Sequence, residues 1–239
     1  MDAMSTITRA QRSAISKYLK THDLPVGLGT PEAACSIAAI NLALTGELTD
    51  RIPDCMSEVI GRWIIVTQDE MPTALRNSLE WKRLLPLAAG TGREKESERL
   101  ALALEWMWTP VLPSLQSVAD RLGFGTSWNE MCVTRTAEAA EEAARAAEEA
   151  ARATAGAAEA AEEAAWAAAG GQAAATWAAA GAALAAARAA GATAGATAEA
   201  AARAAAEAAW AAARAAGATA GAAWEIFDPC GLLKRMIDV

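Results

Sequence analysis

Apolar residues in the first half of the chain recur at intervals of three and four, the spacing that places side chains on one face of an α-helix. This pattern predicts a helix from Ser5 to Lys20, capped by Ser5, and another from Met56 to Gln68. No convincing stretch alternates apolar and polar residues as a half-buried strand does. The run Ile64-Ile65-Val66 is the only candidate strand, and its neighbours favour helix.

Proline, glycine and capping residues mark where these helices begin and end. Thr30-Pro31-Glu32 combines a capping hydroxyl, a first-turn proline and an acid, so it predicts the start of a helix that Gly46 closes. Pro72-Thr73 predicts the start of another helix, which Pro86 either kinks or ends.

The region around residue 100 is charged first and apolar afterwards. A helix is expected over Arg93–Trp108, following a loop at Gly90-Thr91-Gly92. Pro110 and Pro113 are expected to end it, with a short helix over Ser114–Leu122 after them.

The second half of the chain is dominated by alanine. From Ala137 to Ala223 roughly three residues in five are Ala, which is the best helix former and offers no reactive group. The string AAARAAGATAGA occurs at Ala185–Ala196 and again at Ala211–Ala222, an offset of 26. On one straight helix that offset turns the face by roughly 80°. The repeat therefore predicts separate, antiparallel helices rather than one long rod.

The glycines of this repeat form two G-x-x-x-G pairs, Gly191/Gly195 and Gly217/Gly221. Such a pair can let two helix backbones approach closely, or it can form a C-cap and turn. The phase of the repeat favours the turn.

Charges at the start of the tract follow a heptad that predicts a solvated helix face. Arg145 and Arg152 stand where Glu141 and Glu148 can pair with them at i,i+4.

The last residues form another apolar segment. Asp228-Pro229 is a cap followed by a first-turn proline, so it predicts a helix from Pro229 to about Ile237. Its apolar face is expected to dock back on the N-terminal helices, although a groove on a partner is the alternative.

These elements predict an all-α fold. A multi-helix N-terminal domain packs with an alanine-rich array of antiparallel helices, and a C-terminal helix closes the structure. The expected divisions are residues 1–132, residues 133–223 and residues 224–239.

Composition narrows the possible functions. A net charge of −8 speaks against a nucleic-acid binder and against attraction to an anionic membrane. Residues Ala164–Ala187 carry no charge and are long enough to span a bilayer, but Ala, Gly and Gln are weak membrane residues. The N-terminus has no apolar core of a signal peptide, so a cytoplasmic protein is expected.

Candidate chemistry is sparse. The cysteines, Cys35, Cys55, Cys132 and Cys230, are scattered, and His22 cannot complete a usual zinc set with them. No nucleophile and base pair stands out. We therefore expect no catalytic residues, no metal and no cofactor, and we expect that the protein is not an enzyme.

Large aromatic side chains stand out against the alanine background. A Trp in a field of methyl groups must pack onto something, either within the protein or on a partner. Internal anchoring is the favoured interpretation. The candidate interaction or packing anchors are Trp166, Trp177, Trp210, Trp224 and Phe227.

Part of the N-terminal half resembles a family of phage, prophage and bacterial proteins that have no assigned function. The resemblance is carried by LALTGELTDRIPDCMSEVI at Leu42–Ile60, LLPLAAGTG at Leu84–Gly92 and ERLALALEW at Glu98–Trp106. Together with a downstream proline it covers about a third of the chain. Those proteins also tend to be rich in alanine towards the C-terminus. The resemblance implies an all-α fold and a mobile-element setting, and it transfers no catalytic residue.

These observations predict a helical binding or scaffold protein whose partner is another protein. An acidic tract would suit a basic partner surface, and self-association through the tract is plausible. Two alternatives stay open, an ice-binding or surface-adsorbing protein and a membrane-active helical protein. The ice-binding alternative needs Thr at 11-residue spacing, and Thr154 and Thr176 are 22 apart with Ala165 between them.

Overall fold

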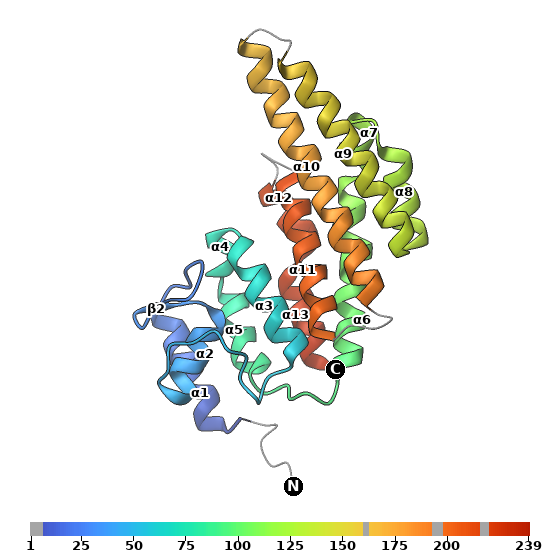
Figure 1. Ribbon diagram of the computed structural model, residues 1–239. Coiled ribbons are helices and arrows are strands. Elements are labelled where there is room, and N and C mark those ends of the chain that lie inside the picture. Colours follow the sequence, from blue (N-terminus) through green and yellow to red (C-terminus); the bar gives the residue numbers. More distant parts are fainter. Residues whose placement is uncertain (1–6, 160–162, 193–197, 216–219) are drawn as a thin grey trace. The chain divides into compact units, whose positions relative to one another are not determined.

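The computed structural model describes residues 7–159, 163–192, 198–215 and 220–239 (Figure 1). The described residues are mostly helical and include only two short strands, which confirms the predicted all-α class. The chain forms two compact units. Unit 1 comprises Met1–Ala103 and Asp228–Val239, and unit 2 comprises Leu104–Phe227.

Unit 1 is a cluster of short helices with one small hairpin. Its elements are α1 (Arg9–Thr21), β1 (Gly29–Thr30), β2 (Ala33–Ala34), α2 (Ser36–Thr45), α3 (Glu58–Glu70), α4 (Thr73–Arg76), α5 (Leu79–Ala88), the start of α6 (Glu96–Trp106) and α13 (Pro229–Asp238).

Side-chain caps begin several of these helices. Thr8 caps α1 and forms a capping box with Gln11, whereas the expected cap, Ser5, lies outside the described residues. Ser57 and Ser78 accept hydrogen bonds from backbone N–H groups at the starts of α3 and α5. The candidate strand at residues 64–66 lies within α3.

The expected helix start at Thr30-Pro31-Glu32 is wrong. Thr30 pairs with Ala33 in the β1–β2 hairpin, and α2 begins only at Ser36. The Tyr18 hydroxyl donates to the Pro31 carbonyl at 2.9 Å and accepts from the Ala34 N–H at 3.3 Å. These long-range bonds outweigh the local capping pattern. Gly46 closes α2 in the left-handed conformation, as expected.

The core of unit 1 lies between α2, α3, α5 and α13. Trp63 and Trp81 are fully buried with their ring centroids 6.1 Å apart, and the Trp81 indole donates to the Ser36 hydroxyl at 3.1 Å. Helix α13 packs its buried residues Leu232 and Leu233 in this unit, against α5 and α3.

Unit 2 contains the alanine-rich helices. Its elements are the rest of α6, a π-helical turn (Met107–Val111), a 3₁₀ turn (Leu112–Leu115), α7 (Gln116–Arg121), α8 (Gly125–Thr134), α9 (Ala137–Glu159), α10 (Glu163–Ala192), α11 (Ala198–Ala215) and α12 (Ala220–Phe227).

Pro110 and Pro113 change the winding after α6 instead of opening a loop. Pro110 lies in the π-helical turn and Pro113 in the 3₁₀ turn, so the chain continues helically into α7. A proline has no N–H for the normal i→i−4 bond, and a local change of winding accommodates this loss.

Helices α9, α10 and α11 pack in sequence order (Figure 1). Arg188 approaches Glu207 at 4.0 Å, and Gly181 lies opposite Ala211. Residue numbers rise on α10 as they fall on α11, so the two helices are antiparallel. Their buried positions are almost all alanine, which lets this part of the tract pack without large side chains.

The repeat boundaries agree with separate helices. Helix α10 ends at Ala192 and α11 at Ala215. Gly195 and Gly217 lie outside the described residues, as do the turns that the G-x-x-x-G pairs were expected to form.

The division into units differs from the expected boundaries. Residues 104–132 belong with the alanine-rich helices, because α11 packs against the π-helical and 3₁₀ turns. Residues 224–227 also belong to unit 2, whereas α13 belongs to unit 1.

Candidate functional site

Two of the five candidate anchors are internal to unit 2. Trp224 and Phe227 are buried, with ring centroids 5.5 Å apart in an edge-to-face arrangement. Trp106 packs edge-on against Phe227, and its indole N–H donates to the Phe227 carbonyl. These three aromatic residues hold α12 against the start of the unit.

Trp177 and Trp210 lie at the surface. Trp177 remains 46% exposed, and Trp210 is half-buried. The side chain of Trp166 lies outside the described residues. The anchors are thus divided between core and surface, a distinction that their residue type alone does not make.

Within residues 174–190 of α10, whose burial the structure describes, the exposed residues form one stripe. Trp177, Gly181, Leu184 and Arg188 are all exposed and follow one another at spacings of four, three and four, so they share one face of the helix. Leu184 is 39% exposed. The stripe therefore leaves two large apolar side chains in water on a helix whose buried residues are mostly alanine.

Helix α11 presents an equivalent stripe. Its less buried residues, Arg203, Glu207, Trp210 and Arg214, stand 26 positions after those of α10. This is the offset of the sequence repeat. The residues of both copies are exposed or half-buried, so both stripes face outward. The eight residues of the two stripes are called here the α10–α11 face.

Arginines surround the aromatic residues of this face. The Arg152 guanidinium of α9 lies 5.9 Å from the centroid of the Trp177 ring, and that of Arg214 lies 5.0 Å from the Trp210 ring. Both arrangements fit cation–π interactions. They also shield part of each ring from water.

The charges on and beside the α10–α11 face sum to a positive value. The sum is +2, because four positive charges and two negative charges are present. The positive charges belong to Arg152, Arg188, Arg203 and Arg214, and the negative charges to Glu148 and Glu207. Glu148 pairs with Arg152 and Glu207 with Arg203, each at 2.8 Å. This local sign is opposite to the net charge of the chain.

The acidic heptad lies on the first half of α9. Arg152 pairs with Glu148, as the spacing predicts. Arg145 instead pairs with Glu142 at i,i+3, at 2.7 Å, and not with Glu141. Both spacings bring side chains together on a helix surface, so the sequence alone did not select between them.

Gly181 is unusual within the exposed stripe. A Cβ built at this position would meet only the Ala211 Cβ, at an ordinary contact distance of 3.8 Å. Alanine would therefore fit and would favour the helix by about 1 kcal/mol. The packing inside unit 2 therefore does not require glycine at this position. A partner backbone that approaches from outside the unit would require it, because a side chain would occupy the space between the two backbones.

The other sequence candidates have structural roles. His22 stacks on Tyr18 with ring centroids 4.2 Å apart, and its Nδ1 lies 2.9 Å from the Tyr18 carbonyl. Burial raises the pKa of Cys230 to about 12 and that of Cys132 to about 11, which keeps these thiols neutral and poorly nucleophilic.

The described part of the chain has neither a metal-binding cluster nor a membrane-spanning helix. It contains no group of three or more His, Cys, Asp or Glu residues arranged to hold a metal ion. No helix in the same described ranges is long and apolar enough to cross a membrane.

Comparisons with protein-family models, with curated proteins and with solved structures found no match.

Proposed function

We propose that this protein is a non-enzymatic helical binding protein whose α10–α11 face receives an amphipathic helix of another protein. The observation that carries the proposal is the exposed stripe of Trp177 and Leu184. Its spacing matches the i, i+4, i+7 anchors with which helices bind one another. Gly181, between the two anchors, leaves room for a partner backbone.

The apolar anchors supply a useful binding energy. A Trp side chain buries up to about 250 Å², so covering the exposed 46% of Trp177 removes roughly 115 Å² from water. At about 25 cal/mol per Å² this contributes about 3 kcal/mol. Leu184 adds about 1 kcal/mol for its exposed 39%.

The charges select the chemistry of the partner. Arg188 and Arg214 flank the apolar residues, and the face has a local charge of +2. We therefore propose a partner helix with acidic residues beside its apolar stripe. This revises the expectation of a basic partner, since the anchors lie among arginines rather than among the glutamates of α9.

The alternative functions lack a comparable observation. Thr176 is fully buried and cannot contribute to a flat surface that adsorbs ice. The resemblance of residues 42–113 supports a phage- or prophage-associated setting for the proposed interaction, and this setting is part of the proposal.

Site-specific photo-crosslinking tests the proposal. A photoreactive amino acid replaces Leu184 in the full chain, and the tagged protein is irradiated in host lysate and its crosslinked peptides are identified. We expect crosslinks to an amphipathic helix that has acidic residues beside its apolar face. A crosslink to a second copy of the chain, or to a basic segment, would contradict the proposal.

Matched variants measure the contribution of the face to binding of the captured protein. Trp177→Ala should weaken binding by about 100-fold, the equivalent of the 3 kcal/mol estimated above. Arg188→Glu should also weaken it, with a reduced dependence on salt. Val133→Ala, which removes an exposed apolar residue of α8, should leave the affinity unchanged. Equal effects of Trp177→Ala and Val133→Ala would refute a role for the face.

A further inference from the structure

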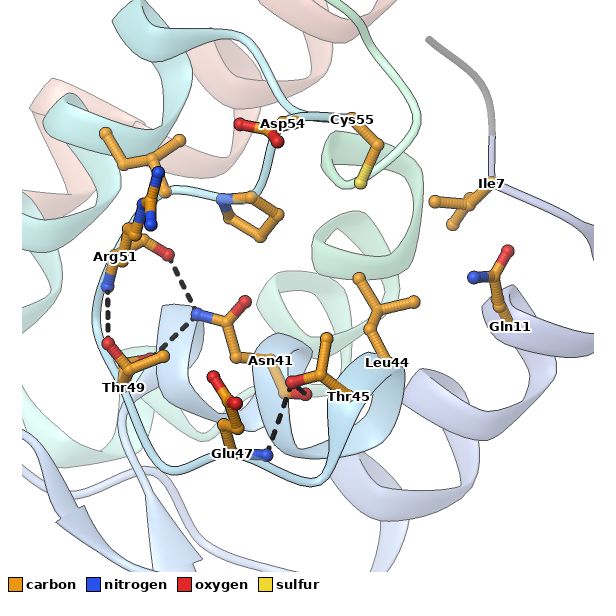
Figure 2. A pocket seen from close by; sticks show the side chains of 12 residues that line it. Ile7, Gln11, Asn41, Leu44, Thr45, Glu47, Thr49, Arg51, Asp54 and Cys55 are labelled. Carbon is orange, nitrogen blue, oxygen red and sulfur yellow. Dashed lines mark hydrogen bonds between the residues drawn. The ribbon is translucent and has the colours of Figure 1, made fainter. Parts of the chain in front are cut away.

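Unit 1 contains a pocket of about 340 Å³ that the proposed function does not use (Figure 2). It lies between the last turn of α2, the loop Glu47–Cys55 that follows, and the start of α1. Its volume falls at the lower end of the range for small-molecule sites.

Asn41 shapes the pocket by holding the loop in place. Its Nδ2 donates to the carbonyl oxygens of Thr49 and Arg51, both at 2.8 Å (Figure 2). The Thr45 hydroxyl donates to the backbone carbonyl oxygen of Asn41 at 3.0 Å and accepts from the Glu47 N–H at 3.3 Å. The loop therefore arches over the end of α2 instead of collapsing onto it.

The two bonds that Asn41 Nδ2 donates determine the orientation of the Asn41 side-chain amide. Both acceptors are carbonyl oxygens, so the nitrogen must face them and Oδ1 must point the other way. Figure 2 shows Oδ1 turned toward the pocket. Asn41 is only 6% exposed, and no described residue donates to its Oδ1. This oxygen is therefore available to accept a hydrogen bond from a molecule in the pocket.

Gln11 provides the complementary group on the opposite wall. Its Oε1 accepts from the Thr8 N–H at 2.9 Å and from the Thr8 hydroxyl at 3.0 Å, which assigns Nε2 as the free end. In Figure 2 the Gln11 nitrogen points toward the pocket. One wall thus offers an acceptor and the other a donor.

The remaining walls select for a neutral, partly apolar molecule. Ile7, Leu44 and Pro53 supply apolar surface, and the Cys55 sulfur points inward in Figure 2. Burial raises the pKa of the Cys55 thiol, so this group is uncharged near neutral pH. The charged residues of the lining are exposed, at the rim.

We propose that this pocket binds a small neutral molecule that carries a carboxamide and an apolar body. The amide N–H of the ligand donates to Asn41 Oδ1, and its carbonyl accepts from Gln11 Nε2. The apolar body lies against Leu44 and Pro53. A carboxylate cannot donate to Asn41, and an ammonium cannot accept from Gln11.

Protein-observed NMR tests this proposal with three matched probes: benzamide, benzoate and benzylamine. Titration of the full-length protein with benzamide should shift the backbone amide signals of residues 41–55. Benzoate and benzylamine should bind at least about tenfold more weakly, because each lacks one of the two hydrogen bonds. Benzamide should also slow alkylation of Cys55 in the same concentration range.

Gln11→Glu is the sharpest variant. Glutamate at this position keeps the acceptor that completes the capping box with Thr8, so α1 is retained, but it removes the donor that faces the pocket. Benzamide binding should fall by about tenfold, and benzylamine should gain affinity. Glu80→Gln, which changes an exposed carboxylate of α5 outside the pocket lining, should leave benzamide binding unaltered.

The outcomes are decisive in both directions. Selective benzamide binding that Gln11→Glu removes and Glu80→Gln retains would support the site. Absence of benzamide binding, equal binding of benzoate, or an unchanged affinity in Gln11→Glu with α1 intact by circular dichroism would overturn it.

Discussion

Replacing Arg99 by methionine should destabilise unit 1 by about 3 kcal/mol. Arg99 is 2% exposed, and burial lowers the pKa of its guanidinium. Its Nε donates to the Met236 carbonyl in the last turns of α13 at 3.1 Å. Its two terminal nitrogens donate to the carbonyls of Gly92 and Thr91, at 3.0 and 2.9 Å. One side chain thus joins α13, α6 and the loop before α6.

The magnitude follows from the groups left behind. Methionine fills much of the same volume but donates nothing, so the carbonyls of Gly92 and Met236 lose a partner in a buried environment. Each such loss costs about 1–3 kcal/mol. Relief from burying the guanidinium charge offsets part of this cost. For a unit of roughly 115 residues, 3 kcal/mol lowers the melting temperature by about 12 °C.

Hydrogen exchange followed by mass spectrometry is the appropriate assay. The two units need not unfold together, so a single unfolding midpoint would mix their stabilities. Exchange in peptides covering residues 229–238 reports directly on α13. Faster exchange there, with unchanged exchange in α9, would show that the loss is confined to unit 1.

The control is Arg83→Met, which removes an exposed cation from α5 and should change stability by less than about 0.5 kcal/mol. Arg99→Lys should be intermediate, because lysine keeps the charge but not the three-way donor geometry. Equally slow hydrogen exchange of α13 in Arg99→Met and in Arg83→Met would contradict this prediction.

Three further predictions concern the same unit and the thiols. Glu96 accepts three hydrogen bonds at the start of α3, so Glu96→Gln should cost about 1–2 kcal/mol in a urea titration, and no loss would disprove its capping role. Asp228 caps α13 with a positive φ of 45°, so Asp228→Ala should speed exchange in α13 more than Asp228→Asn, which keeps the cap. Iodoacetamide at pH 8 should label Cys55 before Cys132 and Cys230, as peptide mass spectrometry would show. Burial raises the pKa of the last two from 9.0 to about 11 and 12, so their contribution to stability is complete below pH 9 and is lost as the pH rises towards those values.

Local patterns predicted much of the helical structure. The Asp228-Pro229 cap begins α13 as expected, and Gly46 ends α2. Such features act within a few residues, so a sequence displays them directly. The pattern at Thr30-Pro31-Glu32 failed because its competitor, the Tyr18 hydroxyl, lies a helix away and comes into range only in the folded unit.

The candidate face was only partly predictable. Trp177 and Trp210 were identified as anchors by their contrast with alanine, but internal packing was the favoured interpretation. Leu184 and Gly181 were missed as members of a face, although their spacing from Trp177 could have indicated one. The pocket was not foreseen, because its polar groups, Asn41 and Gln11, come from two helices that meet only through folding.

The sequence by itself determined that the chain is all-α and that its alanine tract divides into separate helices, because helix propensity, capping and the phase of a 26-residue offset are local properties. Tertiary structure decided which anchors are buried and which face water. Trp224 and Phe227 enter the core since Trp106 receives them, whereas Trp177 and Leu184 remain outside since α9 and α11 cover only the alanine faces of α10. Alanine faces are nearly interchangeable, so the register that exposes one stripe is a property of the packed helices.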